Sequence, residues 1–175
     1  MNDAVRAIVA EQLGREPQGF ERVAVWRGNR PAVIQVAPIV AMKPFPTLFW
    51  LVDEALNLAI DRLEAGGLIA EFQKQIDAES HLRERMLIDH REHNKLRDQF
   101  WTSEQRVRIA DLGFEPVFES RGVGGIASTD RIRCLHTWFA SHLVRPNTVG
   151  VMLEPKLDPQ LFDMIQLDSS LSILK

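Results

Sequence analysis

The stretch covering residues 122–150 constrains the fold most, because it holds a glycine-rich turn, a helix start and a helix stop within one short run. Glycine adopts backbone angles that other residues resist, and the candidate glycine loop consists of Gly122, Gly124 and Gly125. Ser128 or Thr129 can then cap a helix, since a short side-chain oxygen accepts an otherwise unpaired backbone N–H. Pro146 stops it, because proline disfavours helical geometry in the residue before it. The stretch predicts a loop followed by a helix from about residue 130 to residue 145.

This central helix has an apolar and a polar face. At 100° per residue, four apolar side chains fall within about 80° of each other and predict a core face: Ile132, Leu135, Phe139 and Leu143. His136 and His142 border that face on opposite edges, and Arg133 lies on the polar side together with Ser141.

Cys134 and His136 resemble a fragment of a metal site. Residues two apart on a regular helix, however, point roughly 160° to 200° apart, so the pair cannot chelate one ion from such a helix. Zinc sites also need three or four converging ligands. We therefore expect no metal ligands, no cofactor and no metal requirement for folding, with Cys134 packed beside Trp138.

The remaining segments predict an α+β fold: a single domain over residues 1–175, mostly helical, with a small antiparallel or mixed sheet that includes an N-terminal β-hairpin. Asn2 or Asp3 caps a first helix. The runs at 22–27 and 32–37 flank a Gly-Asn turn and predict the hairpin. A buried extended segment follows at 47–51, and Asp53 caps the next helix. Four further helices are expected: one from Leu68, a long one over 78–101, one over 103–113 and a short one from Asp158. Strands are expected at FEPVFES and VGVML, and the final SSLSILK is expected to be a loosely held tail.

The long helix carries ionisable residues within its apolar stripe. His90, His93 and Arg97 lie on or beside the face that also holds Leu82, Met86, Leu96 and Phe100. One interpretation is a solvated end of the helix; the other is a buried or cleft-lining polar cluster, in which Asp89 could orient His93 across one turn.

Composition narrows the function class. The formal net charge is −3, with acidic and basic residues interspersed, which argues against nucleic-acid binding and anionic-membrane binding. The N-terminus lacks the apolar run of a signal peptide, and no stretch approaches the 18 apolar residues of a membrane span. One cysteine permits no internal disulfide, which fits a cytoplasmic location.

The assembled pattern resembles an uncharacterised bacterial family, domain of unknown function 501. The resemblance covers about residues 22–155 and is carried by RPAVI, PFPTLFWL, RLEAGG, DHREHNKLRD, GGIASTDRIRCLHTWFASHL and NTVG. It points to these positions: His90, Arg97, Arg133, Cys134, His136, His142, Asn147 and Gly150. Trp26 and Asp53 stand where the family often has cysteines, so a family metal site using those cysteines would be absent or altered here. The resemblance implies no established activity.

Three functions stay open. The first is a polar cleft lined by histidine and arginine that binds a small anionic ligand, such as a phosphorylated one; its candidate residues are His90, His93, Arg97, Arg133, His136, His142 and Asn147. In this hypothesis the His93 face packs toward the His136 edge of the central helix. The second is a non-catalytic module that binds a protein partner. The third is a Cys/His-dependent enzyme, which requires a base within hydrogen-bond reach of Cys134. Whether the chain is an enzyme is left open.

Overall fold

The computed structural model describes residues 3–174 and has the expected α+β architecture. The α-helices are α1 Asp3–Leu13, α2 Glu54–Ala65, α3 Leu68–Ala78, α4 Ser80–Phe100, α5 Ser103–Asp111, α6 Glu115–Ser120, α7 Leu135–Val144 and α8 Thr148–Leu153. The strands are β1 Phe20–Arg27, β2 Arg30–Val36, β3 Ile39–Val40, β4 Lys43–Pro44, β5 Phe49–Leu51 and β6 Ile165–Leu167. Short 3-10 turns, η1 to η4, cover Val123–Gly125, Glu154–Lys156, Pro159–Phe162 and Ser169–Leu174.

The predicted hairpin forms the centre of a four-stranded antiparallel sheet. The strand order is β5-β2-β1-β6, and β3 and β4 make a separate two-stranded ribbon. Gly28 has a positive φ of 61° at the hairpin turn, as the Gly-Asn signal predicted. The predicted extended segment is confirmed as β5, which pairs with β2.

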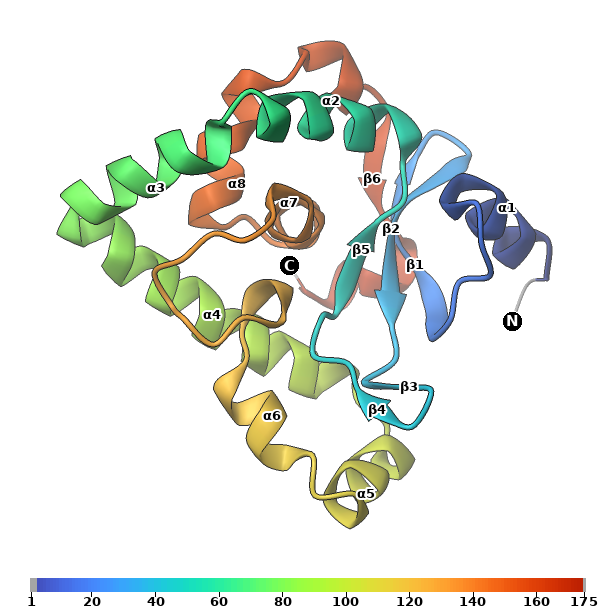
Figure 1. The fold of residues 1–175 in the computed structure, drawn as a ribbon. Coiled ribbons are helices and arrows are strands. Elements are labelled where there is room, and N and C mark those ends of the chain that lie inside the picture. The colour runs from blue at the N-terminus through green and yellow to red at the C-terminus, as the bar shows by residue number, and fades with distance from the viewer. Residues whose placement is uncertain (1–2, 175) are drawn as a thin grey trace.

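Helix α7 lies at the centre of the molecule. Figure 1 shows it nearly end-on, with the sheet on one side and α2, α3, α4 and α8 around it. Its residues Leu135 and Phe139 are fully buried, as predicted, and join the main core with Trp138. Helix α1 covers the opposite face of the sheet, where Val9 packs in a second, smaller core.

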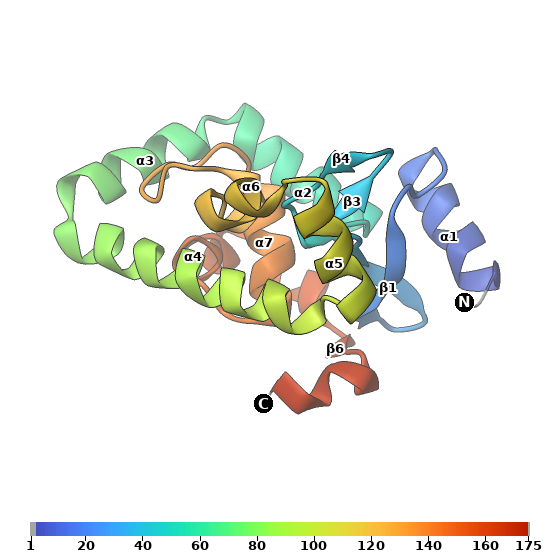
Figure 2. The same ribbon diagram turned by 90° about the horizontal axis from the view of Figure 1, so that it is seen from below.

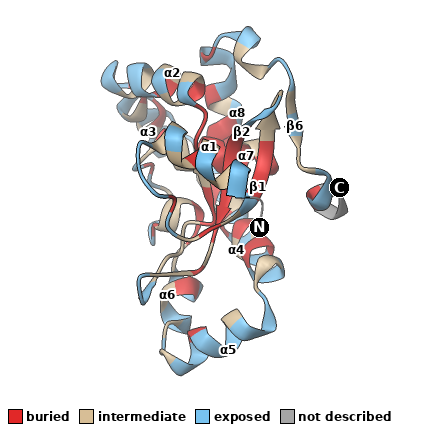
Figure 3. Cartoon of the chain, turned by 90° about the vertical axis from the view of Figure 1, so that its right-hand side faces the viewer, coloured by how far each residue is buried: buried red, intermediate tan, exposed pale blue. Residues whose placement is uncertain are grey.

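The outer helices are more exposed than this centre. Burial concentrates in α7 and the sheet strands, whereas α5 is largely exposed (Figure 3). Seen from below, α4 runs along one side of the molecule, and α5 lies at its C-terminal end (Figure 2). No helix among residues 3–174 is long and apolar enough to cross a membrane.

Several predicted helix starts are confirmed. Asp53 caps α2 by accepting from the Leu56 N–H, and α4 occupies nearly the whole predicted range. Asp3 is the first residue of α1 and so does not cap it; the other predicted cap, Asn2, lies outside the described residues. The short turn after Asp158 is a 3-10 helix, with Asp158 capping the Gln160 N–H.

Three predicted elements are wrong. The FEPVFES segment is helix α6, because Pro116 occupies the first helical turn, where its missing N–H costs nothing. The VGVML segment is helix α8, because the Asn147 side chain accepts from the Gly150 N–H and starts a helix. The central helix begins at Leu135, five residues later than the cap signal indicated. The tail is also better packed than expected, since Leu171 is buried; Lys175 lies outside the described residues.

Candidate metal centre

His90 is buried in a structural contact. Its Nδ1 accepts from the Val123 N–H at 2.9 Å, and its ring lies against Trp138 with centroids 5.1 Å apart. Burial lowers the pKa of His90, with nearby Asp89 acting in the opposite direction. Gly122 is required at this contact, because a Cβ there would lie 2.0 Å from His90 Nδ1. The glycine loop therefore makes room for an imidazole ring.

His93 and Arg97 are likewise engaged in the interior. His93 Nδ1 lies 3.1 Å from Ser141 Oγ on α7, and burial, with smaller effects of Arg97 and His90, lowers its pKa to about 3. Arg97 is only 2% exposed and donates to three backbone carbonyls, those of Pro46, Phe118 and Arg121. The solvated interpretation of this end of α4 is therefore wrong, and its polar side chains connect α4 to neighbouring segments.

His142 and Asn147 organise the turn between α7 and α8. His142 Nδ1 accepts from the Asn147 N–H at 3.2 Å, and Nε2 lies 3.3 Å from Glu154 Oε2. The Asn147 side chain donates to the Trp138 carbonyl at 2.9 Å. A Cβ at Gly150 would lie 2.1 Å from the His142 ring, so this ring also packs directly on a glycine.

The expected shared cleft does not form. His93 faces Ser141 on the α4 side of α7, whereas His136 contacts Asn57, Asp61 and Glu64 of α2. A small hollow of about 150 Å³ includes His93 and Asn147 but none of the other five candidate ligand-binding residues, and Arg133 is exposed. The candidate ligand-binding residues thus belong to separate clusters, because α7 stands between α2 and α4.

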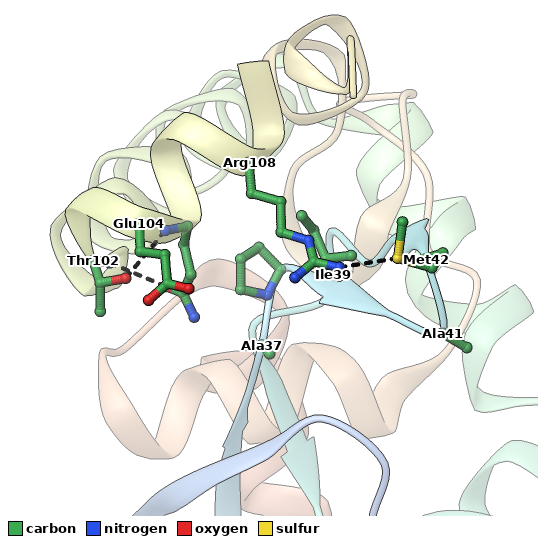
Figure 4. A pocket seen from close by; sticks show the side chains of 9 residues that line it. Ala37, Ile39, Ala41, Met42, Thr102, Glu104 and Arg108 are labelled. Atoms are coloured by element: carbon green, nitrogen blue, oxygen red, sulfur yellow. Dashed lines mark hydrogen bonds between the residues drawn. The ribbon is translucent and has the colours of Figure 1, made fainter. Parts of the chain in front are cut away.

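A larger open hollow, of about 590 Å³, contains none of the residues singled out in the sequence. It lies between the β3–β4 ribbon and α5, where Arg108 reaches across to the Met42 sulfur at 3.0 Å (Figure 4). Thr102 and Glu104 stand on the helix side of the same hollow. It brings no cluster of nucleophilic or metal-ligating side chains together.

Cys134, His136 and Glu64 do form such a cluster. Cys134 Sγ lies 3.6 Å from His136 Nδ1, and the same nitrogen lies 3.3 Å from Glu64 Oε1. All three donor atoms lie within 4.8 Å of one another. The prediction that Cys134 and His136 point apart is wrong, because Cys134 precedes α7 and has extended backbone angles, φ −156° and ψ 124°. A regular helix does not pass through both residues.

Contacts from α2 hold the cluster in place. His136 Nε2 lies 3.3 Å from both the Asn57 carbonyl and Asp61 Oδ1. Glu64 Oε1 also accepts from the Leu135 N–H at 2.6 Å, and this hydrogen bond satisfies a backbone donor in the first turn of α7. Helix α2 therefore supplies one donor of the cluster and orients another.

Two of the three separations in the cluster match edges of a tetrahedral zinc site. Bond lengths of about 2.3 Å to sulfur and about 2.0–2.1 Å to nitrogen or oxygen give edges of about 3.6 Å for S···N and about 3.3 Å for N···O. The corresponding separations here are 3.6 Å and 3.3 Å.

The electrostatics of the cluster favour positive charge. Burial by itself would lower the pKa of His136, but the adjacent Cys134 sulfur and the Glu64 carboxylate raise that pKa to about 9.

Comparison with known proteins assigns the chain to a family. The family described as Protein of unknown function (DUF501) matches residues 23–154. This chain belongs to the DUF501 family. The matched region runs from within β1 to the start of η2 and includes the whole Glu64–Cys134–His136 cluster. No curated protein and no solved structure matches the chain.

Sequence reasoning named Cys134 and His136 but missed Glu64. Glu64 lies 70 and 72 residues away in the sequence, on the polar side of an amphipathic helix, where a carboxylate is ordinarily solvated. The RLEAGG stretch of the family resemblance contains this residue and was the one sequence signal that could have drawn attention to it.

Proposed function

We propose that this DUF501 protein binds a thiophilic divalent cation, zinc foremost, through Cys134 Sγ, His136 Nδ1 and the Glu64 carboxylate. The observation that carries the proposal is the pair of separations, 3.6 Å and 3.3 Å, which correspond to two edges of a zinc tetrahedron.

The donor set supports zinc over harder ions. Thiolate and imidazole are preferred by zinc and similar ions, whereas magnesium and calcium prefer oxygen donors alone. One thiolate, one carboxylate and one neutral imidazole also balance a divalent charge, so the loaded site would be neutral.

The surroundings of His136 support the same assignment. A histidine that ligates a metal usually donates its other ring N–H to a carboxylate or a backbone carbonyl, which fixes the ring and its tautomer. His136 has both kinds of acceptor at Nε2, from Asp61 and Asn57.

Three protein ligands leave one tetrahedral position for water or another ligand. Catalytic zinc sites commonly have this composition, whereas structural sites usually have four protein ligands. We therefore propose that the bound cation can exchange its fourth ligand.

The test is calorimetric titration of zinc chloride into tag-free protein that has been stripped with a chelator. We expect about one equivalent to bind, with binding strongly weakened in Cys134→Ser, His136→Ala and Glu64→Gln. His81→Ala is the matched control, because His81 also lies near a glutamate, at 3.4 Å from Glu79, but has no thiol beside it. Absence of stoichiometric binding, or equal binding by the three variants and the wild type, would overturn the proposal.

A second function is favoured by the same contact. His136 Nδ1 is a base within reach of the Cys134 thiol, the arrangement a cysteine nucleophile requires. Alkylation by iodoacetamide separates the two functions. A metal ligand is protected by stoichiometric zinc, whereas a nucleophile in a protein that does not bind zinc reacts at the same rate with and without the ion.

A further inference from the structure

Cys134 is the only sulfur donor of the proposed site and the only cysteine in the chain. Its side chain is half-buried, and the neighbouring His136 and Glu64 side chains are 20% and 24% exposed. A small reagent can therefore approach the sulfur from solvent. Resting on the proposed function, we infer that the site is redox-gated: a hydroperoxide oxidises Cys134, and the protein then releases its cation.

The chemistry involves one two-electron step. The Cys134 thiolate attacks one oxygen of hydrogen peroxide, an S–O bond forms and the O–O bond breaks. Sulfur is oxidised to sulfenic acid, and the leaving hydroxide, once protonated, becomes water. The peroxide supplies both the oxidant and the oxygen atom, so the step needs no other reagent.

Oxidation removes the donor on which the preference for soft cations depends. Sulfenic acid has neither the charge nor the soft electron pair of a thiolate. Glu64 and His136 would then be the remaining donors of the cluster, and two donors rarely hold zinc against competing chelators. A site with several cysteines would keep sulfur ligands after one oxidation, whereas this site keeps none.

The gate is reversible only with help from outside the chain. A sulfenic acid normally condenses with a second thiol to form a disulfide and water, and this chain has no second cysteine. An external low-molecular-weight thiol must therefore form the mixed disulfide, and a second equivalent must reduce it. Recovery of metal binding should depend on added thiol.

Metal release should leave the fold intact. The segment before α7 has other attachments: the Gln73 amide donates to the Asp130 carbonyl at 2.9 Å and accepts from the Ile132 N–H at 3.1 Å. Arg131 pairs with Asp77 at 3.2 Å. Oxidation of Cys134 should thus change only the ligands of the cation and leave the surrounding contacts in place.

The experiment treats zinc-loaded, tag-free protein with hydrogen peroxide in the presence of a chromophoric zinc chelator. We expect released zinc to equal oxidised Cys134 in moles, as quantified by peptide mass mapping, and dithiothreitol followed by fresh zinc to restore loading. Peptide mapping is needed because exposed methionines also gain oxygen, notably Met42 and Met164, which are 57% and 70% exposed. Met164→Leu is the matched control and should release zinc like the wild type.

The outcomes separate the two proposals. Failure of the untreated protein to bind zinc overturns the metal assignment and the gate with it. Zinc that stays bound while Cys134 is oxidised, or that leaves while Cys134 is still reduced, overturns the gate alone. A Cys134 that resists excess peroxide in zinc-loaded protein does the same.

Discussion

Replacing Arg97 with methionine tests whether this arginine is a structural connection or part of an anion site. Methionine keeps much of the length of the side chain and removes the guanidinium. In the structure Nη1 donates to the Pro46 carbonyl at 3.2 Å and the Arg121 carbonyl at 3.0 Å, and Nη2 donates to the Phe118 carbonyl at 2.5 Å. The substitution therefore leaves three carbonyl oxygens without their donor.

The expected loss follows from two opposing terms. Three hydrogen bonds from a charged donor contribute about 1.5–3 kcal/mol each, or about 4.5–9 kcal/mol together. Against this, burial lowers the pKa of Arg97 to about 10 from 12.5, which corresponds to a cost of about 3 kcal/mol for the buried charge. The difference, about 1–6 kcal/mol with a centre near 3 kcal/mol, is the predicted fall in the free energy of unfolding.

Denaturant melts of Arg97→Met and Arg97→Lys measure this fall in the free energy of unfolding. Lysine keeps the charge but cannot direct donors to three carbonyls at once, so Arg97→Lys should lose about as much as Arg97→Met. Arg85→Met, on the exposed side of the same helix, is the control and should change stability by less than about 0.5 kcal/mol. A loss below about 1 kcal/mol in Arg97→Met, or wild-type stability in Arg97→Lys, would refute the structural role.

Three further predictions concern the interior and the metal site. Gly122→Ala should lower the free energy of unfolding by about 2–3 kcal/mol in denaturant melts, because the added Cβ would lie 2.0 Å from His90 Nδ1. The control Gly14→Ala, which has a positive φ but open space around its Cβ, should lower it by about 1 kcal/mol. Equal losses in the two variants would contradict the close contact at Gly122. His93 has a pKa of about 3 in the folded protein against 6.5 in the unfolded chain, so unfolding takes up a proton at any pH between these two pKa values. The contribution of neutral His93 to stability is therefore fully present above pH 6.5 and is lost as the pH falls. Relative to His93→Gln, which removes this titration while leaving those of His90 and His136, the wild type should lose about 1 kcal/mol between pH 7.5 and pH 5.5. Parallel pH profiles of the two proteins would contradict the assignment. Asp61→Asn should weaken zinc binding about tenfold in calorimetry without changing the stoichiometry, because Asp61 orients His136 and the Asn57 carbonyl is still present; an unchanged affinity would remove Asp61 from the site.

Much of the fold could be predicted from local patterns. The hairpin, the Asp53 cap and the long helix depend on signals within a few residues of each element, and the structure confirms all three. The apolar stripe of α7 also gave Leu135 and Phe139 as core residues correctly, although the helix is shorter than predicted.

The start of α7 could not be predicted, because distant residues determine it. Ser128 and Thr129 are good capping residues, yet Gln73 from α3 accepts from the Ile132 N–H and Glu64 from α2 accepts from the Leu135 N–H. These long-range bonds hold the preceding segment out of the helix, and they bring Cys134 to His136. The error in the helix start and the missed cluster therefore have one cause.

The mutual placement of the histidines was also beyond local reasoning. Periodicity put His93 and His136 on helix faces but did not show which neighbouring helix each face meets. Since α2 and α4 lie on different sides of α7, the histidines separate into a packing group and the candidate metal centre.

The most direct test of the central claim is zinc K-edge X-ray absorption on tag-free protein loaded with one equivalent of zinc. The proposed centre predicts one sulfur scatterer at about 2.3 Å and about three nitrogen or oxygen scatterers at about 2.0–2.2 Å, with the sulfur lost in Cys134→Ser. A spectrum with only nitrogen and oxygen neighbours in the wild type, or one that Cys134→Ser leaves unchanged, would contradict the assignment of Cys134, His136 and Glu64 as a metal centre.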